Sequence, residues 1–279
     1  MENPEVVENV DIEDTEIEEV EEVEEMIEKP TLVTAPIPQF HLKSKAGDLI
    51  DLFSAVNTLL DEATFSITND GVSLREMDSS RIAMVSFSRS RYSFVEYEVV
   101  KEGKICIDLK SLLKILSRAG RKGEVTLESA GDRLKIKFGG RTFTMPFLEA
   151  GDEEVPEPKI DFTTKIKLTT EGFLRAIEDA ELVSDSVKIT TNEEGIGIIA
   201  EGDLMSADLH FSKGDDITLD LYTQTPASAS YSLDYLKDIA KAGKRLGESV
   251  TIEYSEDMPM KATFDDAGNT TFWLAPRIE

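Results

Sequence analysis

ICIDLKSLLKILSRAG at residues 105–120 and ASYSLDYLKDIAKAG at residues 229–243 follow the same plan. In each stretch, alternating apolar residues typical of a strand pass directly into apolar residues at helical spacing. Each stretch ends in Ala-Gly, and a glycine after a helix commonly caps it. Because the two stretches are about 124 residues apart, the chain is expected to contain two related halves.

The repeat extends around both stretches. Residues 47–87 correspond to residues 172–211, and each segment predicts a helix, a hairpin and one further strand. Two more strands follow each Ala-Gly, at 124–127 and 133–138 in the first half and at 250–254 and 260–264 in the second. Each half therefore predicts an α+β domain with helices on one face of an antiparallel sheet.

The domain boundaries are predicted where this patterning stops. We expect an acidic tail at 1–39, a first domain at 40–146, a connector containing Pro and Gly at 147–160, and a second domain at 161–279. The tail contains fourteen of the 56 acidic residues and only Lys29 as a base. Such dense like charge opposes collapse and predicts disorder. The alternative is a tail that mimics nucleic acid or docks a partner.

The net charge limits the kinds of partner. It is -26 for the chain, and without the tail it is still -13, so a nucleic-acid site has to be a local basic surface on an acidic molecule. No apolar run approaches the roughly 20 residues of a membrane span, and no signal peptide pattern begins the chain. Cys106 is the single cysteine. We expect a cytoplasmic protein without disulfides or a membrane partner.

The residues that catalysis requires are scarce. His41 and His210 are the two histidines, and neither has a metal-binding spacing. The phosphate-binding, dinucleotide-binding and serine-nucleophile motifs are missing. We therefore expect no enzymatic activity, no metal and no cofactor.

Basic residues gather in the second predicted helix of each half. They are Lys110, Lys114, Arg118, Arg121 and Lys122 in the first half, and Lys237, Lys241, Lys244 and Arg245 in the second. One such stripe usually marks only a solvated helix face, but two in a duplicated fold come to the same side of the molecule. They would attract phosphates without reading base sequence. No aromatic residues lie between them, which favours duplex over single-stranded nucleic acid.

Three stretches carry a family resemblance. LREMDSSRIAMV at 74–85, LLKILSRAG at 112–120 and LAPRIE at 274–279 resemble the sliding clamps of the proliferating cell nuclear antigen type, which archaea and eukaryotes contain. The likeness covers residues 40–279 and looks more like an archaeal member. It implies the DNA-clamp fold, in which three subunits of two domains close a pseudo-sixfold ring, with helices lining the hole and sheets outside.

The resemblance also implies two protein-binding sites. A peptide-binding pocket on the outer face would contain Met77, Ile82, Met84, Leu148, Val155, Pro259, Trp273, Ala275 and Pro276. The alternative for Trp273 is that it only packs in the core and does not bind a partner. The subunit interface would join residues 141–145 of one subunit to 204–211 of the next through Arg141, Phe143, Met145, Leu204, Ala207, Leu209 and Phe211. The alternative is that the tail or the connector covers these edges.

The chain departs from the family at its first helix. Residues 46–60 contain no Lys or Arg but include Asp48 and Asp51, and the equivalent helix of the second half offers chiefly Arg175. DNA contact is therefore predicted to depend mainly on the second helix of each half, with Arg175 added.

The expected function is that of a DNA sliding clamp, a polymerase processivity factor for replication and repair. By resemblance, its partners are double-stranded DNA, two further clamp subunits, a clamp loader, DNA polymerase, flap nuclease and DNA ligase. It would act at the archaeal nucleoid, or in the nucleus of a eukaryote. The alternatives are a protein-binding scaffold and a specialised paralogue that works only in a heterotrimer. The sequence leaves open homotrimer against heterotrimer, the set of partners and the purpose of the tail.

Overall fold

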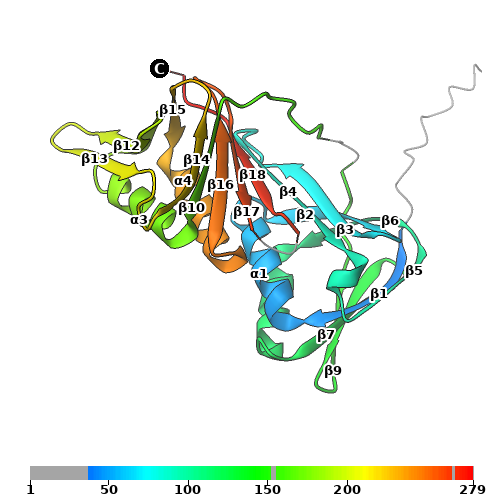
Figure 1. Ribbon diagram of the computed structural model, residues 1–279. Helices are drawn as coiled ribbons and strands as arrows, with labels where there is room; N and C mark the ends of the chain where they lie inside the picture. The colour runs from blue at the N-terminus through cyan, green and yellow to red at the C-terminus, as the bar shows by residue number, and fades with distance from the viewer. Residues whose placement is uncertain (1–36, 152–154, 266–267, 279) are drawn as a thin grey trace, which may run out of the picture. The chain divides into compact units, whose positions relative to one another are not determined.

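The computed structural model describes residues 37–151, 155–265 and 268–278. They form antiparallel sheets and a layer of helices (Figure 1). Nearly all of the predicted tail and residues 152–154 of the predicted connector lie outside the described residues.

Three sheets contain the strands. The first has the order β5 (Glu96–Lys101), β1 (Gln39–Lys45), β7 (Glu124–Ala130), β8 (Arg133–Phe138) and β9 (Arg141–Pro146). The second has the order β14 (Thr218–Thr223), β10 (Thr164–Thr169), β16 (Ser249–Tyr254), β17 (Met260–Phe264), β18 (Thr271–Leu274), β4 (Ala83–Ser90), β3 (Gly71–Met77), β2 (Glu62–Thr68) and β6 (Gly103–Asp108). The third has the order β13 (Ser206–Ser212), β12 (Gly195–Glu201), β11 (Ser186–Thr191) and β15 (Ala227–Ser232).

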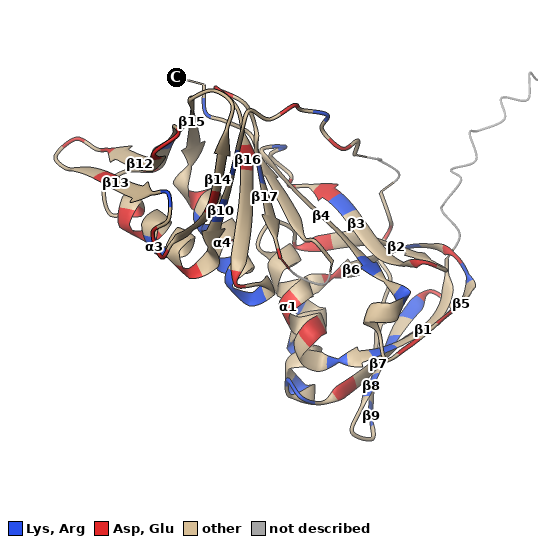
Figure 2. Cartoon of the chain, viewed as in Figure 1, with Lys and Arg blue, Asp and Glu red and all other residues tan. Residues whose placement is uncertain are grey.

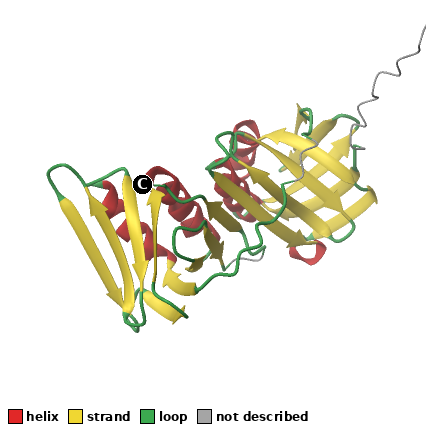
Figure 3. Cartoon of the chain, turned by 90° about the horizontal axis from the view of Figure 1, so that it is seen from above, coloured by secondary structure: helices red, strands yellow, loops and turns green. Residues whose placement is uncertain are grey.

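The α-helices lie next to one another on one side of the sheets (Figure 3). They are α1 (Ala46–Asn57), α2 (Leu109–Leu116), α3 (Thr170–Glu181) and α4 (Leu233–Leu246), with short 3₁₀ turns η1 (Arg91–Ser93) and η2 (Ser117–Ala119). Helix α1 packs against both α2 and α4, and α4 packs against α3. No helix among the described residues is long and apolar enough to cross a membrane.

The order of elements repeats along the chain. The run α1, β2, β3, β4 in the first half matches α3, β11, β12, β13 in the second, and β6–α2–β7–β8 matches β15–α4–β16–β17. The predicted α+β class, with two duplicated parts and helices on one face of antiparallel sheets, is confirmed. Each helix turns an apolar face to the sheets; α1, for example, buries Leu49, Leu52, Phe53 and Val56.

One sheet runs through both halves of the chain. Strand β18, near the C-terminus, pairs with β4 of the first half, so that Phe272 lies opposite Val85 and Trp273 opposite Met84. This pairing makes the nine-stranded sheet continuous from β14 to β6. It also places the C-terminal strand beside residues of the first half, where both contribute side chains to the same face.

The two Ala-Gly pairs have different roles, and the prediction of a glycine cap is wrong for the second. Gly120 follows η2 with a φ of 72°, a left-handed conformation suited to glycine. Helix α4, however, continues through Gly243 to Leu246. A Cβ at Gly243 would lie 1.8 Å from the ring of the buried Phe264. Gly243 therefore allows the helix to approach β17 closely.

We expect Gly243→Ala to lower the free energy of unfolding by about 1–3 kcal/mol, because the added methyl group overpacks a filled core. Alanine's helix preference, worth about 1 kcal/mol, acts in the opposite direction. Denaturant unfolding followed by circular dichroism measures the difference. Gly151→Ala is the control, because its Cβ would meet nothing within 4 Å. Equal stability of the two variants would contradict this role of Gly243.

Candidate functional site

The basic ends of α2 and α4 flank the beginning of α1. The backbone N–H of Ala46 donates to the carbonyl of Gly123 at 2.7 Å, and that of Gly47 donates to Arg121 at 2.9 Å, so the loop after α2 adjoins the first turn of α1. On the other side, Arg245 and Leu246 of α4 line a hollow together with Asp48 and Asp51 of α1. The two predicted stripes therefore belong to one helix layer (Figure 2).

Five of the ten predicted DNA-contacting cations form ion pairs within the chain. These pairs are Lys110–Asp61 at 2.7 Å, Arg121–Asp51 at 2.5 Å, Arg175–Glu171 at 3.1 Å, Lys237–Glu181 at 2.5 Å and Lys244–Glu171 at 2.7 Å. Most are well exposed, where an ion pair adds little to stability. Their main effect is to place a carboxylate beside each cation, which weakens its attraction for a phosphate.

The other five cations have no ion pair among the described residues, and we call them the unpaired cations. All are exposed. They are Lys114, Arg118 and Lys122 in or just after α2, and Lys241 and Arg245 in α4. With no carboxylate at ion-pair distance among the described residues, their charge is more available to a phosphate than that of the paired cations, although Arg245 shares a hollow with Asp48 and Asp51.

Glu171 links two helices of this layer. It lies in the first turn of α3 and contacts Arg175 of its own helix and Lys244 of α4. The hydrogen bond from Lys244, followed by that from Arg175, holds the pKa of Glu171 below its ordinary value. Sequence reasoning missed this carboxylate, although its spacing of four residues from Arg175 is a recognised signal for an ion pair.

A row of side chains crosses the outer face of the nine-stranded sheet. Residues directly opposite one another share a face, and the register places Met77, Met84, Trp273, Lys261 and Glu253 in succession on β3, β4, β18, β17 and β16. Trp273 and Met84 are only 5% and 3% exposed, yet both lie outside the contiguous hydrophobic core. The structure thus brings three of the predicted pocket residues together.

Trp273 is covered from the connector side. Phe162 lies with its ring centroid 6.0 Å from that of the indole, and the Lys261 ammonium is 5.3 Å from the ring. The indole Nε1 is buried without a hydrogen-bond partner among the described residues. Trp273 lines a hollow of about 720 Å³ together with connector residues such as Ile160. Sequence reasoning missed both Phe162 and Ile160. Ile160 is an apolar residue in a polar connector, which could have signalled its role, whereas Phe162 follows the predicted end of the connector.

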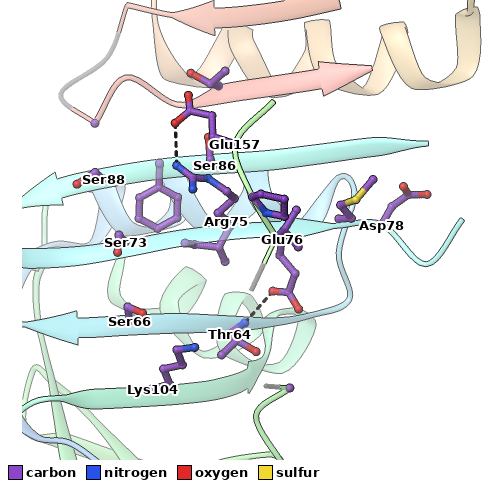
Figure 4. A pocket seen from close by; sticks show the side chains of 18 of the residues that line it. Thr64, Ser66, Ser73, Arg75, Glu76, Asp78, Ser86, Ser88, Lys104 and Glu157 are labelled. Atoms are coloured by element: carbon purple, nitrogen blue, oxygen red, sulfur yellow. Dashed lines mark hydrogen bonds and ion pairs between the residues drawn. The ribbon is translucent and has the colours of Figure 1, made fainter. Parts of the chain in front are cut away.

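A second hollow, of about 1130 Å³, lies between the connector and strands β2 to β4 (Figure 4). Met77 and Val155 line it, and Arg75 of β3 reaches across to Glu157 of the connector at 3.0 Å. Glu76 turns toward β2, where it accepts the N–H of Thr64 at 2.9 Å. Burial raises the pKa of Glu76 despite this hydrogen bond.

The other predicted pocket residues lie beside this row, with one exception. Ile82, 39% exposed, accepts the N–H of Ala275 through its carbonyl at 2.9 Å, and Pro276 follows. Pro259 precedes Met260, which pairs with Leu274. Leu148 instead pairs with Cys106 of the edge strand β6. Four strand spacings separate β6 from β18, or about 19 Å.

Asp78 holds the loop that carries Ile82. Its carboxylate accepts the N–H groups of Ile82 at 2.8 Å and Ala83 at 2.7 Å, and the hydroxyl of Tyr235 from α4 at 2.8 Å. Burial opposes ionisation, but these hydrogen bonds, first that of Ala83 and then that of Tyr235, hold the pKa of Asp78 below its ordinary value. The loop is thereby fixed to the second half of the chain.

The predicted interface strands are both sheet edges. Strand β9 ends the five-stranded sheet, and β13 ends the four-stranded sheet. Phe143 stacks on Phe138 at 5.5 Å, and Met145 is buried. On β13, Ala207, Leu209 and Phe211 pack against the core while staying partly exposed. Leu204, in the loop before β13, is 96% exposed. No described segment pairs with the outer side of either strand.

The charges at these edges have opposite sign. Arg141 begins β9, and Arg133 begins its neighbour β8. Asp208 lies within β13, and Glu201 ends β12. The two edges differ in sequence and in charge, which suits a head-to-tail contact.

Comparisons with known proteins agree on one family. The model of the proliferating cell nuclear antigen N-terminal domain matches residues 40–141, and that of its C-terminal domain matches residues 156–277. The DNA polymerase sliding clamp of Pyrococcus furiosus is 34% identical over 240 residues, covering 84% of this chain and 96% of that protein. DNA polymerase sliding clamp 1 of Pyrobaculum aerophilum is 33% identical over 239 residues, with the same coverage.

Solved structures show the same likeness. The proliferating cell nuclear antigen of Thermococcus kodakaraensis superposes with a TM-score of 0.80 and 29% identity, covering 85% of this chain and all of that one. That of A. fulgidus, solved with the C-terminal region of FEN-1 bound, gives a TM-score of 0.77 and 26% identity, covering 86% of this chain and 99% of that one. The chain belongs to the proliferating cell nuclear antigen family.

Proposed function

We propose that this chain is a subunit of a DNA sliding clamp, which encircles duplex DNA and tethers other proteins to it. The observation that carries the proposal is the position of the unpaired cations of both halves on one helix layer, with the sheets behind them. Such a surface attracts the phosphate backbone without contacting base edges. The archaeal relatives named DNA polymerase sliding clamps support the same function.

Encirclement removes the need for strong contact. A closed ring stays on DNA by topology, so the cations only have to keep the duplex centred and mobile. Five unpaired cations in a subunit provide few phosphate contacts. The other five cations each have a carboxylate beside them, which weakens their attraction for DNA. Weak, sequence-independent contact of this kind permits sliding.

Ring closure would use the two open edges. We place β9 of one subunit against β13 of the next, with three subunits in the ring and the partly exposed apolar residues of both strands between them. An exposed strand edge is a ready template for such pairing. Opening the ring requires a separate loader, because the chain lacks a nucleotide-binding motif.

The outer row around Trp273 is the proposed docking site for partner peptides. Methionine side chains adapt to different partners, and the indole of Trp273, 5% exposed beneath Phe162, lies beside them. The A. fulgidus relative was solved with the C-terminal region of FEN-1 bound, which supports flap nuclease as one partner class. DNA polymerase and DNA ligase are the other proposed partners. The clamp would act on DNA in the archaeal cytoplasm, and the chain itself would have no catalytic activity.

The unpaired cations should contribute more to DNA binding than the paired ones. The triple variant Arg118→Ala, Lys241→Ala, Arg245→Ala is expected to reduce the slope of log affinity against log salt by about 2–3 for each subunit that contacts DNA, because each lost phosphate contact removes about 0.9. The matched control is Lys110→Ala, Arg175→Ala, Lys237→Ala, which loses the same charge and should change the slope by less than half as much. The affinity of each variant for short linear duplex DNA, measured across salt concentrations, gives both slopes, because retention on a circle is set by topology. Equal slopes would reject the distinction.

Partner peptides of the pattern Gln-x-x-aliphatic-x-x-aromatic-aromatic should change the fluorescence of Trp273, the single tryptophan. Met77→Ala is expected to weaken peptide binding about tenfold, as truncation of an interface anchor commonly does. Leu148→Ala is the control, with an expected change below twofold, because Leu148 lies at the β6 edge. A scrambled peptide tests specificity. Unchanged emission together with no measurable binding would exclude this pocket.

The edge strands should determine assembly. The parent protein is expected to have the mass of three chains by light scattering, and Leu209→Lys is expected to yield monomers because it places a charge in the apolar contact. Leu219→Lys on β14 is the control, since Leu219 is 52% exposed and lies outside both proposed edges. Both variants should keep the parent's circular dichroism spectrum. A parent chain that stays monomeric alone but assembles with sister subunits would instead support the heterotrimer.

A further inference from the structure

The site proposed for partner peptides is covered in the structure. Trp273 and Met84, in the middle of the outer row, are only 5% and 3% exposed. We propose that the side chain of Phe162 is a removable cover, which holds against Trp273 the position that an aromatic side chain of a docking peptide takes, and which the peptide displaces. This role rests on the proposed docking function, and it makes an aromatic side chain the feature that the site selects.

The cluster around Trp273 is separate from the hydrophobic core. Trp273 and Met84 lie outside the contiguous core, although their strand neighbours Phe272 and Val85 belong to it. Successive side chains of a strand point to opposite faces of the sheet. The indole therefore lies on the outer face, away from the core, and its low exposure is due to side chains that lie over it.

Two side chains cover the indole, and they differ in how firmly they are held. The Lys261 ammonium is 5.3 Å from the ring centroid and also pairs with Glu253 at 3.7 Å. Lys261 belongs to β17, which pairs with β16 on one side and β18 on the other. Phe162, in contrast, precedes β10, is partly exposed and is not packed against the core. Its ring, 6.0 Å from the indole, is the part of the cover that can leave.

The backbone on either side of Phe162 is anchored, so the cover opens by rotation of the side chain. The Ser255 hydroxyl donates to the carbonyl of Asp161 at 3.4 Å and accepts the N–H of Thr163 at 2.9 Å. The hollow of about 720 Å³ beside the connector adjoins the ring and gives it space to turn. Rotation of a partly exposed side chain is fast, so the cover does not delay docking.

An aromatic side chain of a partner is the occupant that fits this position. Phe162 itself shows that the space against the indole accepts an aromatic ring, at an interplanar angle of 35°. An incoming ring would exchange one aromatic pair for another of similar strength, and the peptide would add apolar contact with Met84. The indole Nε1 is buried with no hydrogen-bond partner among the described residues. A carbonyl of the docked peptide would satisfy this donor.

The first experiment tests the cover without any peptide, by quenching the fluorescence of Trp273, the single tryptophan, with acrylamide. The parent should show the weak quenching of a buried indole, and Phe162→Ala should raise the quenching constant about two- to threefold, because it uncovers one face of the ring. The control is Phe94→Ala, which removes a partly buried ring that stacks on Tyr97 at 5.1 Å. Strong quenching in the parent, or no rise in Phe162→Ala, would overturn the cover.

The second experiment measures binding of the labelled pattern peptide, with Phe at both aromatic positions, by fluorescence anisotropy. Phe162→Ala is expected to tighten binding about three- to tenfold, because the aromatic pair that the peptide has to break is gone. Phe162→Tyr keeps the ring and should bind within about twofold of the parent. Equal or weaker binding by Phe162→Ala would mean that Phe162 is indifferent or forms a wall of the site, and displacement would be rejected.

The incoming ring is identified by replacing the two aromatic positions of the peptide with Ala, one at a time. A peptide that lacks the displacing ring leaves Phe162 in place, so the gain from Phe162→Ala should fall below about twofold for one of the two peptides. A gain that survives both replacements would contradict displacement by an aromatic side chain. If no peptide binds to the parent or to Phe162→Ala while the quenching rises as expected, the docking function fails and the cover itself stands.

Discussion

The pairing of β18 with β4 is the constraint on which the other arrangements depend. It joins a strand from the end of the chain to one from the first half, and so fixes two duplicated units in one continuous sheet. With the sheet continuous, α1 and α4 meet on its inner side. On its outer side, Met84 and Trp273 come from different halves and lie opposite each other. The helix layer and the outer row are therefore two results of one strand pairing.

Local interactions hold this junction. The carboxylate of Asp78 accepts three backbone N–H groups of its own loop and the hydroxyl of Tyr235 from the other half. Because its pKa is lowered in the folded state, the stability from this ionised group is present above the pKa of an unfolded Asp and is lost as the pH falls through the lower, folded value. Gly243 acts next to this junction, at β17, which neighbours β18, since a side chain there would push α4 away from Phe264.

Much of the fold could be predicted from the sequence because each pattern of apolar residues occurs in both halves of the chain. A helix, a hairpin and a strand-to-helix unit recurring at a constant offset left little freedom in the order of elements. Gly243 was misinterpreted as a helix cap. In sequence, a glycine at the end of an apolar helical pattern looks the same whether it caps the helix or lets the helix pack closely against a neighbouring strand. The approaching ring, Phe264, lies some twenty residues further along, and no local pattern identifies it.

The site residues were less predictable for a related reason. Spacing identified which cations share a helix face, but Asp51 of α1 neutralises Arg121 in the loop after η2, and Glu181 of α3 neutralises Lys237 of α4. Such pairs depend on how helices pack, which a sequence pattern does not specify. The cations that remain unpaired could be found only once the helix layer was assembled. A surface that looks strongly basic in sequence is thus weakly basic in space. For a ring that has to slide on DNA, this moderation is an advantage, because contact strong enough to hold the backbone in place would oppose movement along it.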